Sequence, residues 1–215
     1  MSSKSCTSSV PAERVLDDDP PLVAVYADEA CIGNGREGEN PGGAGGLIEI
    51  LGSDGLVRRD YWISENATTN NRMALRSVIE AFRALSKKGN TFRVVFTSDS
   101  RYIIDGMSDW VHRWVARGWR RKAGPVENKE LWQEAIDAVN GHSVQWRWVR
   151  GHAGHPQNEY ANVLATKAAR ELSASHGAIP SQFDLWLAAE RAAGRIALEP
   201  DPLPTRFASH RALPR

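Results

Sequence analysis

Two aspartates stand at the ends of apolar segments, where carboxylates can act together. Asp28 follows the run LVAVYA at residues 22–27, and Asp99 follows the run FRVVFTS at residues 92–98. In open α/β sheets the functional crevice lies outside the carboxyl ends of the strands, so the two carboxylates converge if these strands are neighbours. Paired carboxylates suit a hard divalent cation such as Mg²⁺, because it prefers oxygen ligands. The alternative is that each aspartate only caps the segment that follows it.

A histidine further along the chain can take part in the same chemistry. His152 lies in the glycine-flanked loop of VRGHAGHPQNEYANVLA, directly after a predicted strand, and Pro156 begins the next predicted helix. A histidine on such a loop can transfer protons near a cation site. A transition-metal site formed by His152 and His155 is disfavoured, because no cysteine or third histidine stands at suitable spacing. The plain alternative is a surface histidine without a catalytic role.

Basic and aromatic residues are interleaved in WVHRWVARGWRRK, residues 110–122, which we call the basic segment. Its cations are Arg113, Arg117, Arg120, Arg121 and Lys122, and its tryptophans are Trp110, Trp114 and Trp119. Cationic side chains contact phosphates and aromatic rings stack on bases or sugars, so the segment predicts a nucleic-acid surface. The alternative is a solvated basic helix whose tryptophans pack on the core. The four-residue spacing of Trp110 and Trp114 favours some packing of that kind.

Alternating strands and helices are predicted to position these residues. The strand candidates are residues 22–27, 44–51, 56–63, 92–98 and 144–149, and the helix candidates begin near residues 70, 100, 127 and 156. The first helix, which opens with TTNNRMALRSV, carries a single apolar stripe. The order of three strands, a helix, a strand, helices, a strand and a helix predicts an α/β fold. The right-handed crossover rule predicts that the fourth strand runs parallel to the first.

The composition is that of an ordinary globular protein. The chain has 215 residues, 25% charged and 41% hydrophobic, which suffices for one domain with a full core plus tails. Because the formal net charge is only +1, a nucleic-acid surface must come from local clustering. We find no apolar run near the roughly 18 residues of a membrane span, no secretion signal and no disulfide framework. We therefore expect a cytoplasmic protein that does not enter a membrane.

The chain divides into three parts. Residues 1–20, rich in Ser, Asp and Pro, predict a disordered leader. Residues 21–175 hold the strands and helices, and residues 176–215 form an extension with a Pro-rich tail. Within the extension, the spacing of Phe183, Trp186 and Leu187 predicts a short helix, with Ser181 as its candidate N-cap. We expect this helix to pack on the domain; the alternative is a helix that binds a partner.

Taken together and in order, six motifs resemble the bacterial-type (type 1) ribonuclease H family. They are YADEACIGN, TTNNRMAL, TSDSRY, WVHRWVARGWRRK, ELW and QWRWVRGHAGHPQNEYAN, and the resemblance covers about residues 22–172. It implies a ribonuclease H-like fold, a five-stranded mixed sheet flanked by helices, with the basic segment as a handle that grips the DNA strand. It also implies Mg²⁺-dependent endonucleolytic cleavage of the RNA strand of RNA/DNA hybrids, with four carboxylates holding two ions and a mobile histidine assisting.

The resemblance assigns roles to individual residues. Asp28 and Asp99 correspond to the first and third metal-binding carboxylates, and His152 corresponds to the mobile histidine. Asn34, Asn70 and Asn71 correspond to groove contacts, whose polar groups can bond phosphates, base edges or the RNA 2′-hydroxyl. The remaining candidate substrate contacts are Arg101, Trp110, Arg113, Trp114, Arg117, Arg121 and Lys122.

Two positions depart from the family in its metal site. Ala74 stands where the family has its second carboxylate, and Asn162 stands where it has its fourth. Glu29 also replaces a usual glycine, and the loop at 33–43 is longer than usual. Because a strand alternates its side chains, we expect Glu29 to point to the face opposite Asp28, and Glu80 lies about 240° around the helix from Ala74. We therefore expect no replacement ligand, and weakened binding of Mg²⁺ or Mn²⁺.

Three functions compete on these residues. The first expectation is a protein that binds RNA/DNA hybrids, with double-stranded RNA as a further candidate, and whose cleavage is weak or lost, as in a pseudoenzyme. The alternative is an active hybrid-specific endoribonuclease with a non-standard metal site. A third is an interaction protein that uses its tails, which the retained basic segment disfavours. We expect a monomer, and the sequence leaves open whether Ala74 and Asn162 arose naturally or by engineering.

Overall fold

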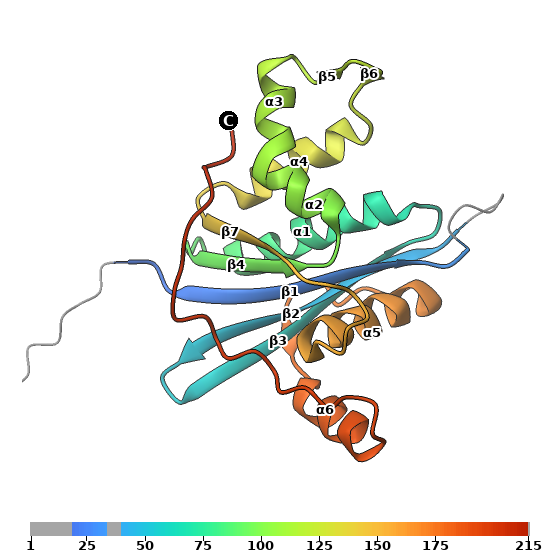
Figure 1. Ribbon diagram of the computed structural model, residues 1–215, viewed down its shortest axis with the longest axis vertical. Coiled ribbons are helices and arrows are strands. Elements are labelled where there is room, and N and C mark those ends of the chain that lie inside the picture. Colours follow the sequence, from blue (N-terminus) through green and yellow to red (C-terminus); the bar gives the residue numbers. More distant parts are fainter. Residues whose placement is uncertain (1–18, 34–39, 215) are drawn as a thin grey trace, which may run out of the picture.

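The computed structural model describes residues 19–33 and 40–214, and these form a six-stranded mixed sheet covered by helices on both faces (Figure 1). The strands of this sheet are β1 (Leu22–Cys31), β2 (Gly42–Gly52), β3 (Gly55–Glu65), β4 (Arg93–Ser98), β7 (Ser143–Trp148) and β8 (Ile179–Pro180). Their order across the sheet is β7-β4-β1-β2-β3-β8. β4 runs parallel to both β1 and β7, whereas β2, β3 and β8 pair antiparallel with their neighbours. The predicted α/β fold and the parallel pairing of the first and fourth strands are confirmed.

The number of strands differs from the expected five. The sixth strand, β8, comes from the extension and pairs with the outer edge of β3. It is two residues long, too short to leave a periodic pattern in the sequence. Its physical effect is to cover part of an edge whose backbone groups would otherwise face solvent unpaired.

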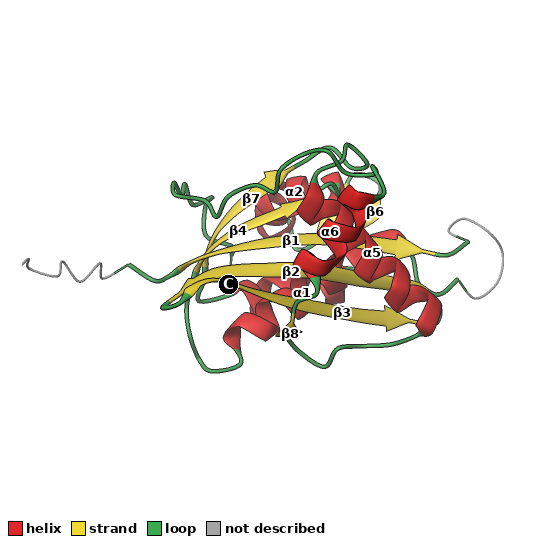
Figure 2. Cartoon of the chain, turned by 90° about the horizontal axis from the view of Figure 1, so that it is seen from below, coloured by secondary structure: helices red, strands yellow, loops and turns green. Residues whose placement is uncertain are grey.

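The helices lie on both sides of this sheet (Figure 2). They are α1 (Asn70–Ser86), α2 (Arg101–Asp105), the π-helix η1 (Gly106–Trp110), α3 (Val111–Ala116), α4 (Lys129–Val139), α5 (Pro156–Glu171) and α6 (Phe183–Ala192). α1 packs on one face of the sheet and against α4, α5 packs on the other face, and α6 packs on α5. After α3, a small hairpin of β5 (Arg120–Arg121) and β6 (Gly124–Pro125) ends the basic segment.

Side chains of β1 alternate between the two cores, and this alternation orients the candidate site. Val23, Val25 and Ala27 belong to the core that contains α1, whereas Ala24 and Tyr26 belong to the core that contains α5. Continuing the alternation places Asp28 on the α5 face and Glu29 on the α1 face. The end of β1 therefore presents adjacent carboxyl groups on both sides of the sheet.

Glycines in β2 let α5 approach the sheet closely. A Cβ at Gly43 would collide with the carbonyl oxygen of Ala165, and one at Gly45 would lie 2.7 Å from the Ala165 nitrogen. The backbone of α5 therefore lies directly on β2, which no larger residue at these two positions would allow. This close contact fixes α5, and with it Asn162, relative to the strand ends.

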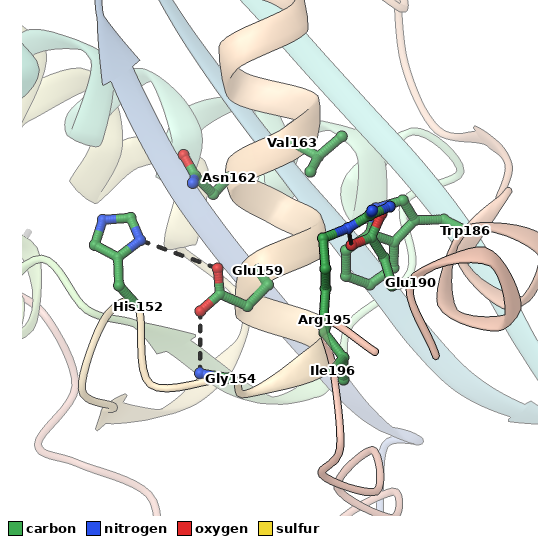
Figure 3. A pocket seen from close by; sticks show the side chains of 9 residues that line it. All are labelled: His152, Gly154, Glu159, Asn162, Val163, Trp186, Glu190, Arg195 and Ile196. Carbon is green, nitrogen blue, oxygen red and sulfur yellow. Dashed lines mark hydrogen bonds and ion pairs between the residues drawn. The ribbon is translucent and has the colours of Figure 1, made fainter. Parts of the chain in front are cut away.

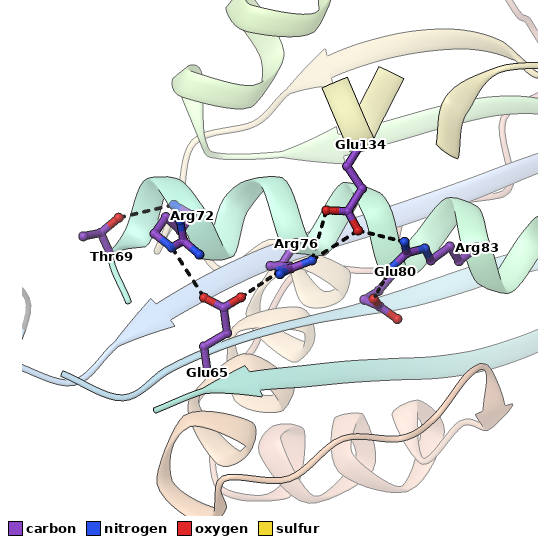
Figure 4. Close-up of polar contacts among 7 residues, drawn as sticks. All are labelled: Glu65, Thr69, Arg72, Arg76, Glu80, Arg83 and Glu134. Carbon is purple, nitrogen blue, oxygen red and sulfur yellow. Dashed lines mark hydrogen bonds and ion pairs between the residues drawn. The ribbon is translucent and has the colours of Figure 1, made fainter. Parts of the chain in front are cut away.

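Charged side chains hold α1 in place on its exposed side (Figure 4). The helix begins after Thr69, whose hydroxyl accepts a hydrogen bond from the Arg72 backbone. Arg76 bridges Glu65 of β3, at 2.7 Å, and Glu134 of α4, at 3.3 Å. Glu80 pairs with Arg83 on the same helix.

The ends of the chain also contact the domain. Of the predicted leader, residues 1–18 lie outside the described residues, and Asp19 pairs with Arg93 at 2.8 Å. The predicted extension helix is confirmed as α6, which packs on the domain; the Ser181 hydroxyl accepts from the Phe183 backbone, although the N-cap itself is Gln182. Within residues 19–33 and 40–214, no helix combines the length and apolar character needed to cross a membrane.

Candidate active site

Asp28 and Asp99 converge at the carboxyl ends of two neighbouring parallel strands. Asp28 is only 7% exposed, and its Oδ1 accepts a hydrogen bond of 2.7 Å from the Glu29 backbone. Burial raises the pKa of Asp28 to about 9, and the charges of Asp99 and Glu29 contribute to the rise. Burial is also the main cause of the raised pKa of Asp99, to which Glu159 adds. Two carboxyls that disfavour ionisation lie at one place, as the sequence predicted.

Glu29 lies next to this cluster, and its carboxyl interacts electrostatically with Asp28 and Asp99. Glu29 does lie on the opposite face of β1 from Asp28, but that does not remove it from the site. Burial raises the pKa of Glu29 to about 8, a hydrogen bond from Ser100 opposes the shift, and the charge of Asp99 adds to it. β1 continues to Cys31, but its parallel pairing with β4 ends at Tyr26, so Asp28 and Glu29 both lie beyond the paired part of that edge. Strand alternation in the sequence predicts that this carboxyl, directly after Asp28, points away from the site.

The chemistry of the cluster fits a divalent cation. The Oε2 atom of Glu29 is buried without a hydrogen-bond partner, which is costly unless something else satisfies it. The backbone of Gly151 lies directly on the Asp99 carboxylate, since a Cβ there would collide with it. Within the described part of the chain, no three acidic, histidine or cysteine side chains already stand in ligand geometry. Because burial raises the pKa of both Asp28 and Glu29, uptake of a cation here would favour proton release.

His152 stands on an exposed loop, and its side chain faces Glu159 of α5 (Figure 3). Its φ of 51° lies in the left-handed region, and its side chain is 77% exposed. His152 Nδ1 lies 4.0 Å from Glu159 Oε2, while Glu159 Oε1 accepts a hydrogen bond of 3.1 Å from the Gly154 backbone. Glu159 therefore holds the loop and faces the imidazole at the same time. Figure 3 shows Asn162 on the same side of α5, across a pocket of about 380 Å³.

The two positions that depart from the family have different surroundings. Asn162 is half-buried, lines the pocket beside His152 and accepts a long hydrogen bond, 3.4 Å, from the Thr166 hydroxyl. Ala74 is 0% exposed and belongs to the apolar core on the α1 face. Although α1 begins only four residues earlier, this position does not open onto a polar crevice with room for a longer side chain. The close packing of the first turn of α1 was not visible in the sequence pattern.

Trp148, which is not among the candidate residues predicted from the sequence, links Asp99 to Arg101. Its indole N–H donates a hydrogen bond of 3.0 Å to the Asp99 carbonyl oxygen. The guanidinium of Arg101 lies 3.8 Å from the centre of the same ring, which is a cation–π contact. The candidate contact Arg101 is thus exposed beside the carboxylates and held by a neighbouring aromatic ring. The signal available in the sequence was only the position of Trp148 at the end of its strand.

The basic segment forms one exposed, cationic depression. Its volume is about 340 Å³, and it is lined by Trp110, Arg113, Trp114, Arg117, Arg120, Arg121 and Lys122. Arg113 pairs with Asp109 and Arg121 with Glu127, which reduces their free charge. Trp114 also packs on the core, 5.3 Å from the ring of Trp132, so the core-packing alternative holds for this residue in part.

The asparagines of the predicted groove are only partly described. Asn71 is exposed and Asn70 is half-buried at the first turn of α1. The third predicted contact, Asn34, lies outside the described residues, as does most of the loop that looked longer than usual. The structure thus brings Asp28, Glu29 and Asp99 together with the His152 loop, and places the basic segment on the α1 side of the sheet (Figure 1).

The sheet order and the position of the carboxylates define a ribonuclease H-like α/β fold, and comparison with known proteins gives the family. A model of the RNase H family matches residues 20–170. The ribonuclease H of Pseudomonas entomophila (strain L48) is 42% identical over 153 residues, which cover 71% of this chain and 96% of that protein. The ribonuclease H of Polaromonas naphthalenivorans (strain CJ2) is 44% identical over 151 residues, covering 69% and 87%.

Solved structures agree with this assignment. The crystal structure of LC9-RNase H1, a type 1 RNase H with the type 2 active-site motif, is 63% identical with a TM-score of 0.84, covering 92% of this chain and 96% of that one. The chain belongs to the RNase H family, whose members cleave the RNA of RNA/DNA hybrids and use divalent metal ions such as Mg²⁺. The family match ends at residue 170, so the extension lies beyond it.

Proposed function

We propose that this chain is an active, divalent-cation-dependent endoribonuclease that cleaves the RNA strand of RNA/DNA hybrids. In this proposal Glu29 takes the place of the carboxylate that the family carries at the position of Ala74. We therefore favour an active enzyme with a non-standard metal site, which the sequence analysis gave as the alternative, over a protein whose cleavage is weak or lost. The observation that carries it is the Glu29 carboxyl, buried beside Asp28 and Asp99 with one oxygen unpartnered.

One relative gives independent support. LC9-RNase H1 is described as having the type 2 active-site motif on a type 1 protein, and it is 63% identical to this chain. A family member whose set of active-site residues differs from the usual type 1 set is therefore known among similar proteins. The departures at Ala74 and Asn162 then represent a shifted ligand set, which favours natural divergence over engineering.

In this proposal each residue of the site has a separate role in cleavage. Asp28, Glu29 and Asp99 would hold the cations, with Asn162 as a neutral oxygen donor, and bound cations would supply charge stabilisation of the phosphate and a more acidic water. His152, exposed on its loop, can carry a proton to or from the crevice. Glu159 orients that loop through the Gly154 backbone. Arg101, stacked on Trp148, can contact the nucleic-acid backbone beside the carboxylates.

The direct test is a cleavage assay on an RNA/DNA hybrid labelled on either strand, with Mg²⁺, with Mn²⁺ and with a chelator. The proposal expects cleavage of the RNA strand only, dependent on the cation, and no cleavage of the same sequence as duplex DNA. Tight hybrid binding without cleavage in either cation would contradict it and would favour a binding protein that has lost catalysis.

The basic segment is expected to supply salt-dependent affinity for the hybrid. Arg117 and Lys122 line the depression and, unlike Arg113 and Arg121, have no ion pair among the described residues. Changing both to alanine should weaken hybrid binding and reduce the slope of log affinity against log salt by about one unit for each phosphate that is no longer neutralised. A matched control changes Lys87 and Lys88, which are exposed at the far end of α1. Equal slopes for the two double variants would refute this role.

The first turn of α1 is expected to distinguish a hybrid from duplex DNA. Amide side chains at Asn70 and Asn71 can hydrogen-bond RNA 2′-hydroxyls and base edges in the wide minor groove, which DNA does not present in the same way. Replacing both by alanine should lower hybrid affinity more than DNA affinity at the same salt concentration. The measurement is a competition titration with hybrid and duplex of one sequence. A ratio of affinities that stays constant between the original chain and the variant would count against the idea.

A further inference from the structure

After α6 the extension runs back across the domain, and residues 208–210 contact β7. Figure 1 shows the C-terminal segment leaving α6 and running back along the sheet toward α3. Ile196 is buried in the same core as Tyr160 of α5, which anchors this return. Five residues later the chain reaches Asp201, a half-buried residue that lies between β7 and α5. The loop that carries His152 connects those same two elements.

Asp201 contacts the elements on both sides of that loop. On the β7 side, its Oδ2 accepts a hydrogen bond of 3.0 Å from Arg147 Nη2. On the α5 side, its backbone N–H and carbonyl oxygen pair with the side-chain amide of Gln157, at 3.1 and 2.8 Å. Gln157 is 0% exposed, so this pairing is shielded from water. Asp201 thus joins the strand before the loop to the helix after it.

His155, the last loop residue before α5, is the third contact. Its Nδ1 accepts a hydrogen bond from the Asn158 backbone, which makes it the N-cap of α5. Its Nε2 lies 3.2 Å from Asp201 Oδ2, and its ring packs 5.6 Å from the ring of Tyr26. The C-terminal end of the loop is therefore held by the helix and by the core, and the Asp201 carboxylate lies directly beside it.

The loop between these anchors has an unusual backbone. His152 and Gly154 both have positive φ, 51° and 78°, a region that non-glycine residues seldom adopt. Inside the loop, the hydrogen bond from the Gly154 backbone to Glu159 opposes relaxation. A backbone of this kind keeps its conformation only when surrounding contacts hold it in place. The contacts at the two ends of the loop therefore help to fix the position of His152.

We propose that Asp201 is a positioning residue for the catalytic histidine loop, and that the extension therefore serves the active site. It acts through Arg147, His155 and Gln157, and it does not itself contact substrate. The inference rests on the proposed function, because it assigns His152 a part in cleavage. It assigns to residues beyond the family match, which ends at residue 170, a role in the reaction that the family domain performs.

The experiment compares Asp201→Ala with Glu199→Ala in the full chain. Glu199 is a matched control, since it lies two residues away, is 82% exposed and pairs only with Arg191 among the described residues. Asp201→Ala should lower kcat on a hybrid by about tenfold while KM changes by less than about twofold, because misplacing a catalytic group by about 1 Å can cost roughly 10²-fold. Asp201→Asn, which can still accept from Arg147, should recover part of the rate.

Hydrogen exchange gives a readout that does not depend on activity. In Asp201→Ala, the backbone amides of residues 150–155 should exchange at least several-fold faster, while those of α1 and β1 keep their original rates. A faster exchange throughout the protein, or unchanged exchange and kcat, would overturn the proposal. If the original chain does not cleave hybrids, the proposed function fails, and local exchange at the loop still decides whether Asp201 positions it.

Discussion

Glu29→Gln is expected to abolish most hybrid cleavage while leaving hybrid binding intact. The change keeps the shape of the side chain and replaces the ionisable carboxyl beside Asp28 and Asp99 with a neutral amide. Even outer partners of a metal ligand are worth about 10–100-fold in affinity or activity, so loss of a direct ligand should cost at least roughly 10²-fold. The measurement is the Mg²⁺-dependent cleavage rate over a range of Mg²⁺ concentrations, beside a binding titration on the same hybrid.

Glu130→Gln provides the control, because Glu130 is an exposed residue in the first turn of α4. It should cleave at the rate of the unchanged chain. Equal rates for Glu29→Gln and the unchanged chain would show that Glu29 is not a ligand, and the proposed ligand set would then be wrong. A chain that is inactive in both forms would instead favour a scaffold that binds hybrids without cutting them.

The same substitution should stabilise the fold at neutral pH when no cation is present. Burial raises the pKa of Glu29 to about 8 from an ordinary value of 4.5. Between these two pH values the unfolded chain loses the proton that the folded chain keeps, so the contribution of Glu29 to stability falls as the pH rises. Glutamine does not ionise, so this loss of stability disappears. The melting temperature should rise by roughly 2–4 °C for each kcal/mol added to the free energy of unfolding. A cluster of functional residues commonly lowers the stability of the fold, because its charges are needed to bind a ligand.

Much of the fold follows from local sequence patterns, because those patterns have few solutions. The apolar runs at β1 and β4 and the helix between them leave little choice but adjacent parallel strands, and this brings Asp28 to Asp99. The basic segment likewise follows from its composition. Local patterns do not predict the path of the chain after α6, because the contacts of Asp201 join residues more than forty positions apart.

Two features of the site could not be predicted from the sequence, and both have the same physical origin. Strand alternation correctly gives the direction of Glu29, but whether a side chain at a strand end reaches the crevice depends on which neighbours surround it. Likewise, helix periodicity places Ala74 near the start of α1, but only packing shows that it is fully buried. Both depend on the close approach of elements, and a pattern along one chain segment does not describe that approach.

Restoring a carboxylate at the two positions that depart from the family is expected to have different effects: a gain in Mg²⁺ affinity at Asn162 and a loss of stability at Ala74. Asn162→Asp should raise Mg²⁺ affinity by about tenfold, because Asn162 is half-buried beside His152 and Glu159 and the change adds a charged oxygen ligand of nearly the same shape to the proposed site. Ala74→Glu should instead destabilise the protein by about 3–5 kcal/mol, because it places an uncompensated charge in an apolar core. The melting temperature should fall by on the order of 10 °C.

Ala188→Glu is the matched control for this cost, since Ala188 is exposed on α6 and its substitution should change stability by less than about 0.5 kcal/mol. The measurements are thermal unfolding without cation and cleavage rates across Mg²⁺ concentrations for each variant. If Ala74→Glu folds as stably as Ala188→Glu and accelerates cleavage, the first turn of α1 must open a polar site, and Glu29 is then not its replacement. If Asn162→Asp alone increases cleavage, the charge missing from this family site lies on α5, and Glu29 already supplies the charge missing from α1.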